Sequence, residues 1–75
     1  MDKKSENKKQ KFKRIANIRT NNVLKALRSL SNLSNTRNYE FTKADVAKIY
    51  HALNNEVRIG KAMFDKSLKN NQFKL

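Results

Sequence analysis

The sequence has no cysteine and no proline, and only one glycine and one histidine, in 75 residues. Without cysteine the chain can form neither a disulfide nor a thiolate metal site, and one glycine is too few for a glycine-rich phosphate-binding loop. The carboxylates are scattered, so they form neither an acid–base pair nor a cluster of oxygen ligands. His51 falls on the polar side of a predicted helix. We therefore expect no enzyme activity, no metal and no cofactor.

Long hydrophobic runs are also missing. No apolar segment approaches the roughly 18 to 20 residues needed to cross a bilayer. The basic N-terminal stretch is not followed by the apolar segment of a secretory signal, and it is too rich in lysine and acids for a transit peptide. A basic amphipathic helix can lie on a membrane surface, but Arg19 interrupts the first predicted apolar face and tryptophan is absent. The sequence predicts a cytoplasmic protein without a membrane partner.

Acidic residues are scarce and basic residues are abundant. Six Asp and Glu stand against 18 Lys and Arg, for a net charge of +12 and a pI near 10.4. Residues 1–37 hold eleven Lys or Arg and two acids, which is +9, whereas residues 38–75 hold seven and four, which is +3. A chain with this charge is attracted to polyanions whatever its fold.

The clearest structural element is a helix predicted over residues 43–69. Thr42 and Asp45 have the spacing of a capping box, and Phe41 and Val46 have the spacing of a hydrophobic staple, so two devices mark the same helix start. Apolar residues then recur at three- and four-residue steps, which places them on one face. That face comprises Val46, Ile49, Tyr50, Leu53, Val57, Gly60, Phe64 and Leu68.

A first helix is predicted over about residues 9–31, after a disordered basic arm at residues 1–10. Its weak point is Arg19 to Asn22, where a break or bend would be tolerated. Residues 11–75 would form a single domain. The apolar face of this helix consists of Phe12, Ile15, Ala16, Val23, Ala26, Leu27 and Leu30.

The two helices are separated by a connection at residues 32–41, rich in Asn and Ser, which favour turns and caps. The predicted fold is an all-α antiparallel helical hairpin. Because a hairpin this small leaves much of each apolar face half wet, we expect it to self-associate, as in a four-helix bundle, or to dock on a larger partner. Four apolar residues fall off the main faces and would mark a second interface if they cluster: Ile18, Leu24, Ile59 and Met63.

Opposite the apolar face of the first helix lies a basic face, which predicts phosphate contacts with nucleic acid. Arg14, Lys25 and Arg28 would make ordered contacts and residues 3–13 mobile ones. In the connection, Arg37 and Tyr39 would either read unpaired bases or simply help to close the bundle. RNA is slightly favoured over DNA because the connection is too long and glycine-free for a helix-turn-helix. The candidate residues are Lys3, Lys4, Lys8, Lys9, Lys11, Lys13, Arg14, Lys25, Arg28, Arg37 and Tyr39.

The alternative is a protein–protein adaptor or inhibitor that docks on an acidic or nucleic-acid-binding surface of a larger protein. A resemblance covers residues 14–64 and rests on the stretch RTNNVLKALRSLSNLSNTRNYEFTKADVAKIYHAL. This stretch resembles short basic open reading frames that are common in bacteria and their mobile elements. The resemblance implies a small protein that exists independently, and it assigns no residue a role. In shape and charge the chain is also broadly similar to small ribosomal proteins that thread into RNA.

Overall fold

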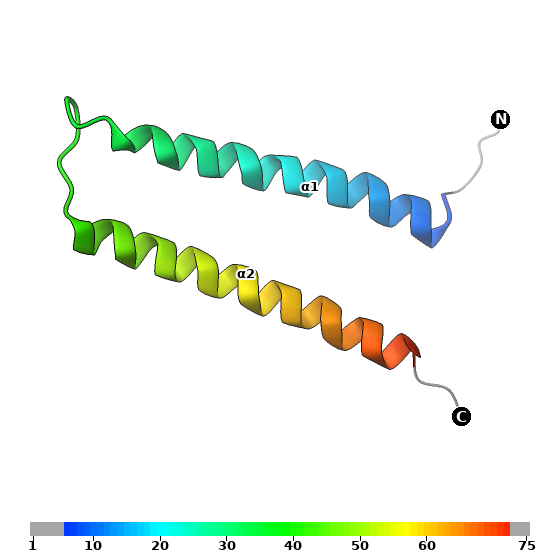
Figure 1. Ribbon diagram of the computed structural model, residues 1–75. Helices are drawn as coiled ribbons and strands as arrows, with labels where there is room; N and C mark the ends of the chain where they lie inside the picture. The colour runs from blue at the N-terminus through cyan, green and yellow to red at the C-terminus, as the bar shows by residue number, and fades with distance from the viewer. Residues whose placement is uncertain (1–5, 73–75) are drawn as a thin grey trace. The chain divides into compact units, whose positions relative to one another are not determined.

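Two long helices account for most of the chain in the computed structural model, which describes residues 6–72, with side chains to residue 69. Helix α1 spans Lys8–Ser31, the 3₁₀ turn η1 follows at Asn32–Ser34, and helix α2 spans Lys43–Gln72 (Figure 1). No strand occurs within residues 6–72. The predicted all-α class, with the chain plan of a helical hairpin, is confirmed. The chain divides into two units, Met1–Tyr39 with α1 and Glu40–Leu75 with α2.

Helix α1 begins earlier than predicted because Asn7 caps it. The Gln10 N–H donates to Asn7 Oδ1 at 2.8 Å, and the Asn7 N–H donates to Gln10 Oε1 at 3.2 Å. This is a capping box with amide side chains on both sides. The prediction of a disordered arm through residue 10 is therefore wrong for residues 8–10, which are helical. Residues 1–5 lie outside the described residues.

Helix α1 is continuous through Arg19 to Asn22, the weak point of its sequence. At its end the Ser31 hydroxyl donates to the Leu27 carbonyl at 3.0 Å, and the Asn32 N–H points at the carbonyls of the last turn. Arg28 also lies in this last turn, where a positive charge is favourable next to the helix dipole. The helix thus tightens into η1 instead of ending in an open loop.

The connection is organised by Asn35. Its side-chain oxygen accepts a hydrogen bond from the Arg37 N–H at 3.0 Å. Its carbonyl accepts from the N–H groups of Asn38 at 3.1 Å and Tyr39 at 3.0 Å. These bonds form an Asx-type turn, as expected for a segment rich in Asn and Ser. The first part of the predicted connection is helical, since η1 occupies residues 32–34.

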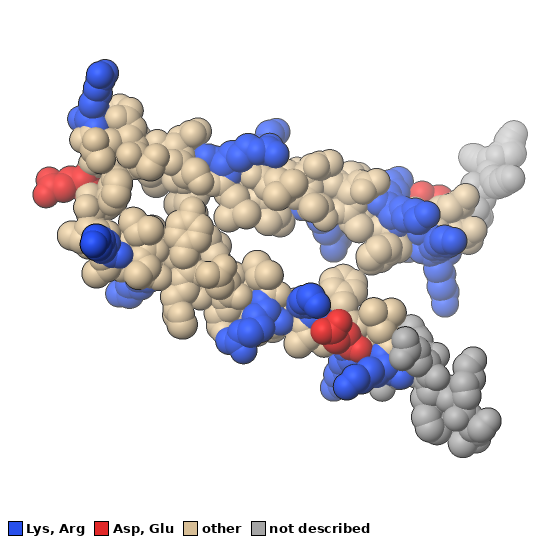
Figure 2. All heavy atoms as spheres, in the orientation of Figure 1, with Lys and Arg blue, Asp and Glu red and all other residues tan. Residues whose placement is uncertain are grey.

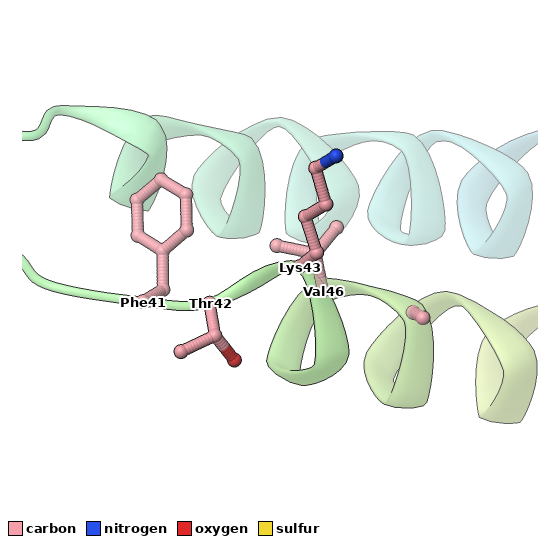
Figure 3. A pocket seen from close by; sticks show the side chains of 5 residues that line it. Phe41, Thr42, Lys43 and Val46 are labelled. Atoms are coloured by element: carbon pink, nitrogen blue, oxygen red, sulfur yellow. The ribbon is translucent and has the colours of Figure 1, made fainter.

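Helix α2 starts where the sequence places it. The Asp45 N–H donates to Thr42 Oγ1 at 3.0 Å, and the Thr42 N–H donates to Asp45 Oδ2 at 2.9 Å, which confirms the capping box. Phe41 and Val46, the pair predicted to form a hydrophobic staple, line one open hollow of about 420 Å³ (Figure 3). The helix continues to Gln72, three residues beyond its predicted end.

The apolar faces form as predicted, but they do not enclose a core. No side chain among residues 6–69 is buried. The half-buried residues of α1 are Ile15, Ala16, Leu27 and Leu30, all from the predicted apolar face. In α2, Val57 lies at the centre of the apolar face and is 68% exposed. The local structure is therefore defined by caps and helix periodicity rather than by interior packing.

Replacing Thr42 with Ala should destabilise α2, because the substitution removes the side-chain acceptor for the Asp45 N–H. The expected loss is about 1 kcal/mol of unfolding free energy, measured by circular dichroism during thermal unfolding at a fixed protein concentration. Thr20→Ala, an exposed substitution inside α1 with no cap to lose, is the matched control. Equal effects of the two substitutions would contradict the assigned cap.

Candidate nucleic-acid interface

One side of α1 carries the ordered basic residues. The 3.6-residue helical repeat aligns Arg14, Lys25 and Arg28, together with Asn21, along the side opposite the half-buried residues. We call these four residues the ridge. All four are exposed, and at 1.5 Å per residue Arg14 and Arg28 are about 21 Å apart along the axis. Figure 2 shows Lys and Arg recurring along α1 on the face in view.

The lysines that precede the ridge are held by the helix. Lys8, Lys9, Lys11 and Lys13 lie in its first two turns and are all exposed. Their prediction as mobile contacts is therefore wrong, because the Asn7 cap orders this segment. The helical repeat places Lys11 and Lys13 on either flank of the ridge and turns Lys8 and Lys9 away from it. Lys3 and Lys4 lie outside the described residues.

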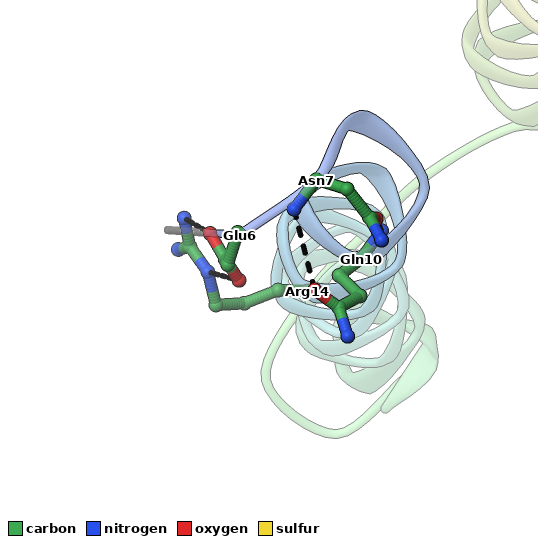
Figure 4. Close-up of polar contacts among 4 residues, drawn as sticks. All are labelled: Glu6, Asn7, Gln10 and Arg14. Carbon is green, nitrogen blue, oxygen red and sulfur yellow. Dashed lines mark hydrogen bonds and ion pairs between the residues drawn. The ribbon is translucent and has the colours of Figure 1, made fainter. Parts of the chain in front are cut away.

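Arg14 forms an ion pair with Glu6 that the sequence did not predict. Its Nε donates to Glu6 Oε2 at 2.8 Å, and its Nη2 donates to Glu6 Oε1 at 2.9 Å, a two-bond arrangement (Figure 4). The hydrogen bond from Arg14 lowers the pKa of the Glu6 carboxyl, and the positive charges of Arg14 and Lys11 act in the same direction. The same hydrogen bond raises the pKa of Arg14.

This ion pair determines how Arg14 can bind a phosphate. The Arg14 and Glu6 side chains are 53% and 37% exposed, so the pair is hydrated and contributes little to stability. A phosphate has the same two-oxygen geometry as a carboxylate and can take the place of Glu6 on Arg14. Within the described residues Lys25 and Arg28 have no ion-pair partner. They are the ridge cations that are open to an anion from the outset.

In the connection, two of the side chains predicted to contact nucleic acid are exposed. Arg37 and Tyr39 use their backbone N–H groups in the turn, while both side chains are exposed, Tyr39 by 48%. The Asn35 side chain is instead committed to the turn. A guanidinium and a phenol ring therefore stand on a short ordered turn, where each can stack on an unpaired base.

Helix α2 carries mixed charge rather than a ridge. Arg58 donates to the side-chain oxygen of Asn55, and Asp65 adjoins Lys66 in the C-terminal half. His51 is exposed. Within residues 6–72 no three His, Cys, Asp or Glu side chains gather as metal ligands would. Nor does the described part contain a helix with the length and apolar character needed to cross a membrane.

Comparison of the chain with protein-family models, with curated proteins and with solved structures found no match. The candidate interface is therefore argued from the residues of the chain itself.

The Glu6–Arg14 ion pair should depend on pH. Because the pKa of Glu6 is lowered in the folded chain, the pair supports the start of α1 above pH 4.5, the ordinary pKa, and is lost as the pH falls through the lowered value. Carboxyl chemical shifts during an NMR titration should place the midpoint of Glu6 below 4.5. Arg14→Gln should raise that midpoint toward the ordinary value, with the charge of Lys11 still lowering it. The same Glu6 midpoint in both chains would show that the pair does not form.

Proposed function

We propose that this protein binds nucleic acid without catalysis, through contacts from the ridge to the phosphate backbone, with RNA slightly favoured over DNA. The observation that carries the proposal is the charge of α1. Its 24 residues contain no acid, and three of its cations, Arg14, Lys25 and Arg28, are exposed along one side. An ordinary solvated helix face mixes both signs, as α2 does with Asp65 and Lys66.

In this proposal the ion pairing of the ridge cations sets the order in which they contact phosphates. Lys25 and Arg28 meet the first phosphates and release their condensed counterions. Arg14 follows by exchanging Glu6 for a phosphate oxygen pair. These contacts position the helix along the backbone and carry no sequence information by themselves.

The preference for RNA rests on the connection. Between η1 and α2 it spans residues 35–42 and contains no glycine, unlike the three- to four-residue turn typical of a helix-turn-helix. The exposed Tyr39 ring and Arg37 guanidinium are suited to splayed single-stranded bases, which RNA loops and ends present. In this proposal Tyr39 and Arg37 supply whatever selectivity the protein has.

The salt dependence of binding tests the proposal. Replacing both Lys25 and Arg28 with Gln removes two phosphate contacts. The logarithm of the binding constant falls linearly with the logarithm of the salt concentration, and on duplex DNA the magnitude of this slope should decrease by about 1.8, at roughly 0.9 per phosphate. Fluorescence anisotropy with duplex DNA, duplex RNA and single-stranded RNA, each at several salt concentrations, measures the slope and ranks the ligands.

The control replaces Lys48 and Lys66 with Gln, which changes the net charge equally but lies on α2. Its slope should stay near that of the parent chain. Glu6→Gln should steepen the slope, because Arg14 then needs no exchange. Equal slopes for the α1 and α2 double variants would mean that net charge alone attracts the polyanion, and would refute the ridge.

The adaptor alternative has one observation in its favour. Ile59 and Met63 are one turn apart on the same side of α2, 44% and 67% exposed, so they form a small apolar patch. Ile18 and Leu24 do not form a second patch, since the helical repeat places them about 120° apart on α1. Of the four residues predicted to mark a second interface, this is the pair that clusters within one helix. An adaptor should lose its protein partner when Met63 is replaced by Gln.

A further inference from the structure

The ridge carries its cations at its two ends. Arg14 stands at one end, and Lys25 and Arg28 stand at the other. Between them, residues 15–24 contain one charged side chain, Arg19, which the helical repeat places on the opposite side of α1. The gap from Arg14 to Lys25 is about 16 Å along the helix axis. Since the phosphates of one duplex strand recur about every 3.4 Å along the axis, this gap suits two strands that border a groove.

Two asparagine side chains occupy the gap on the same side of the helix. Asn17 and Asn21 lie one turn apart, and both are exposed. Neither amide makes a hydrogen bond within the described residues, whereas the amides of Asn7 and Asn35 hold a cap and a turn. Asn is a poorer helix former than Ala because its side chain competes for backbone hydrogen bonds. The two amides therefore weaken the helix slightly, and no contact within the described residues accounts for them.

The uncharged middle of the ridge suits a ligand group that both donates and accepts hydrogen bonds. An amide side chain has two donors and one acceptor oxygen. The ribose 2′-hydroxyl is likewise a donor and an acceptor, and it distinguishes RNA from DNA. An RNA duplex displays these hydroxyls in a wide, shallow minor groove between the phosphates of its two strands. The order along the ridge of cation, two amides and cation matches the order of phosphate, hydroxyls and phosphate across that groove.

The flanks of the ridge are unsuited to a deep groove. Ile18 and Leu24 lie about 60° to either side of Asn21, and they are 52% and 42% exposed. The major groove of B-DNA is about 8.5 Å deep, so a helix inserted there turns its flanks toward the phosphate walls. Ile18 and Leu24 would then face phosphates without a hydrogen bond to offer. A shallow groove is contacted by a single line of side chains, which is what the ridge presents.

We infer that the ridge is an interface for double-stranded RNA that lies across the minor groove. Asn17 and Asn21 contact the 2′-hydroxyls. Arg14 binds phosphates of one strand, and Lys25 and Arg28 bind those of the other. The inference rests on the proposed function, since it names the form of nucleic acid that the ridge binds. To the base contacts proposed for the connection it adds a means of distinguishing an RNA duplex from a DNA duplex.

The test compares three duplexes of one base sequence by fluorescence anisotropy with the full chain, at several salt concentrations. The first is RNA, the second is DNA, and the third is RNA with fluorine in place of each 2′-hydroxyl, which keeps the A-form but cannot donate a hydrogen bond. The parent chain should bind the RNA duplex at least about fivefold more tightly than either of the others, because only the RNA offers both halves of the amide–hydroxyl pairing.

Replacing both Asn17 and Asn21 with Ala should bring the affinities for the three duplexes within about twofold of one another. The salt dependence should stay unchanged, because no charge is altered. Circular dichroism should show equal or greater helix content, since Ala is the better helix former, so a loss of preference is not a loss of folding. Asn22→Ala is the matched control. Asn22 is exposed, adjoins Asn21 and points about 100° away from it, so this variant should keep the RNA preference.

Failure of this inference differs from failure of the proposed function. Equal affinity for the RNA and DNA duplexes, with a salt slope that depends on Lys25 and Arg28, would keep the proposed function and overturn the inference. An RNA preference that survives in the double Asn variant, or that falls equally in Asn22→Ala, would overturn it too. Tighter binding to single-stranded than to duplex RNA would have the same result. So would a base-sequence preference on duplex DNA that the double Asn variant loses, because the amides would then read the major groove.

Discussion

The structure depends on one constraint, which is the small amount of apolar surface that 75 residues can remove from water. Hydrophobic burial is the main favourable term in folding, yet no side chain among residues 6–69 is buried. Two cap motifs, at Asn7 and at Thr42, specify where the helices start. Caps contribute only about 1 kcal/mol each, and isolated helices are marginal in water. Lasting helical structure therefore requires that the apolar faces of the helices be covered.

The distribution of charge follows from the same constraint. In α1 the ridge and the apolar face lie on opposite sides, so covering the apolar face leaves Lys25 and Arg28 exposed. Phosphate contacts from the ridge and burial of the apolar face therefore do not compete for the same side of the helix.

Sequence signals within one helical turn predicted the helices well, whereas a side-chain contact between residues further apart in the sequence was not predicted. Thr42 and Asp45 were recognisable because their contact spans three residues within one helix turn. The Asn7–Gln10 cap has the same spacing but lies in a stretch of Lys and Asn that favours a prediction of disorder. The Glu6–Arg14 pair spans eight residues and starts before the helix cap, so the helical repeat does not predict it. The ridge was predictable from periodicity; the partner of Arg14 was not.

The central claim is that both helices hold only when their apolar faces are covered, as the self-association expected from the sequence would do. Amide hydrogen exchange followed at several protein concentrations tests it most directly, because protection reports the free energy of opening along the backbone. We predict that protection in α1 and α2 rises together as the concentration is raised, while residues 35–41 of the connection change little. Protection that is independent of concentration, or that rises in only one helix, would contradict the account.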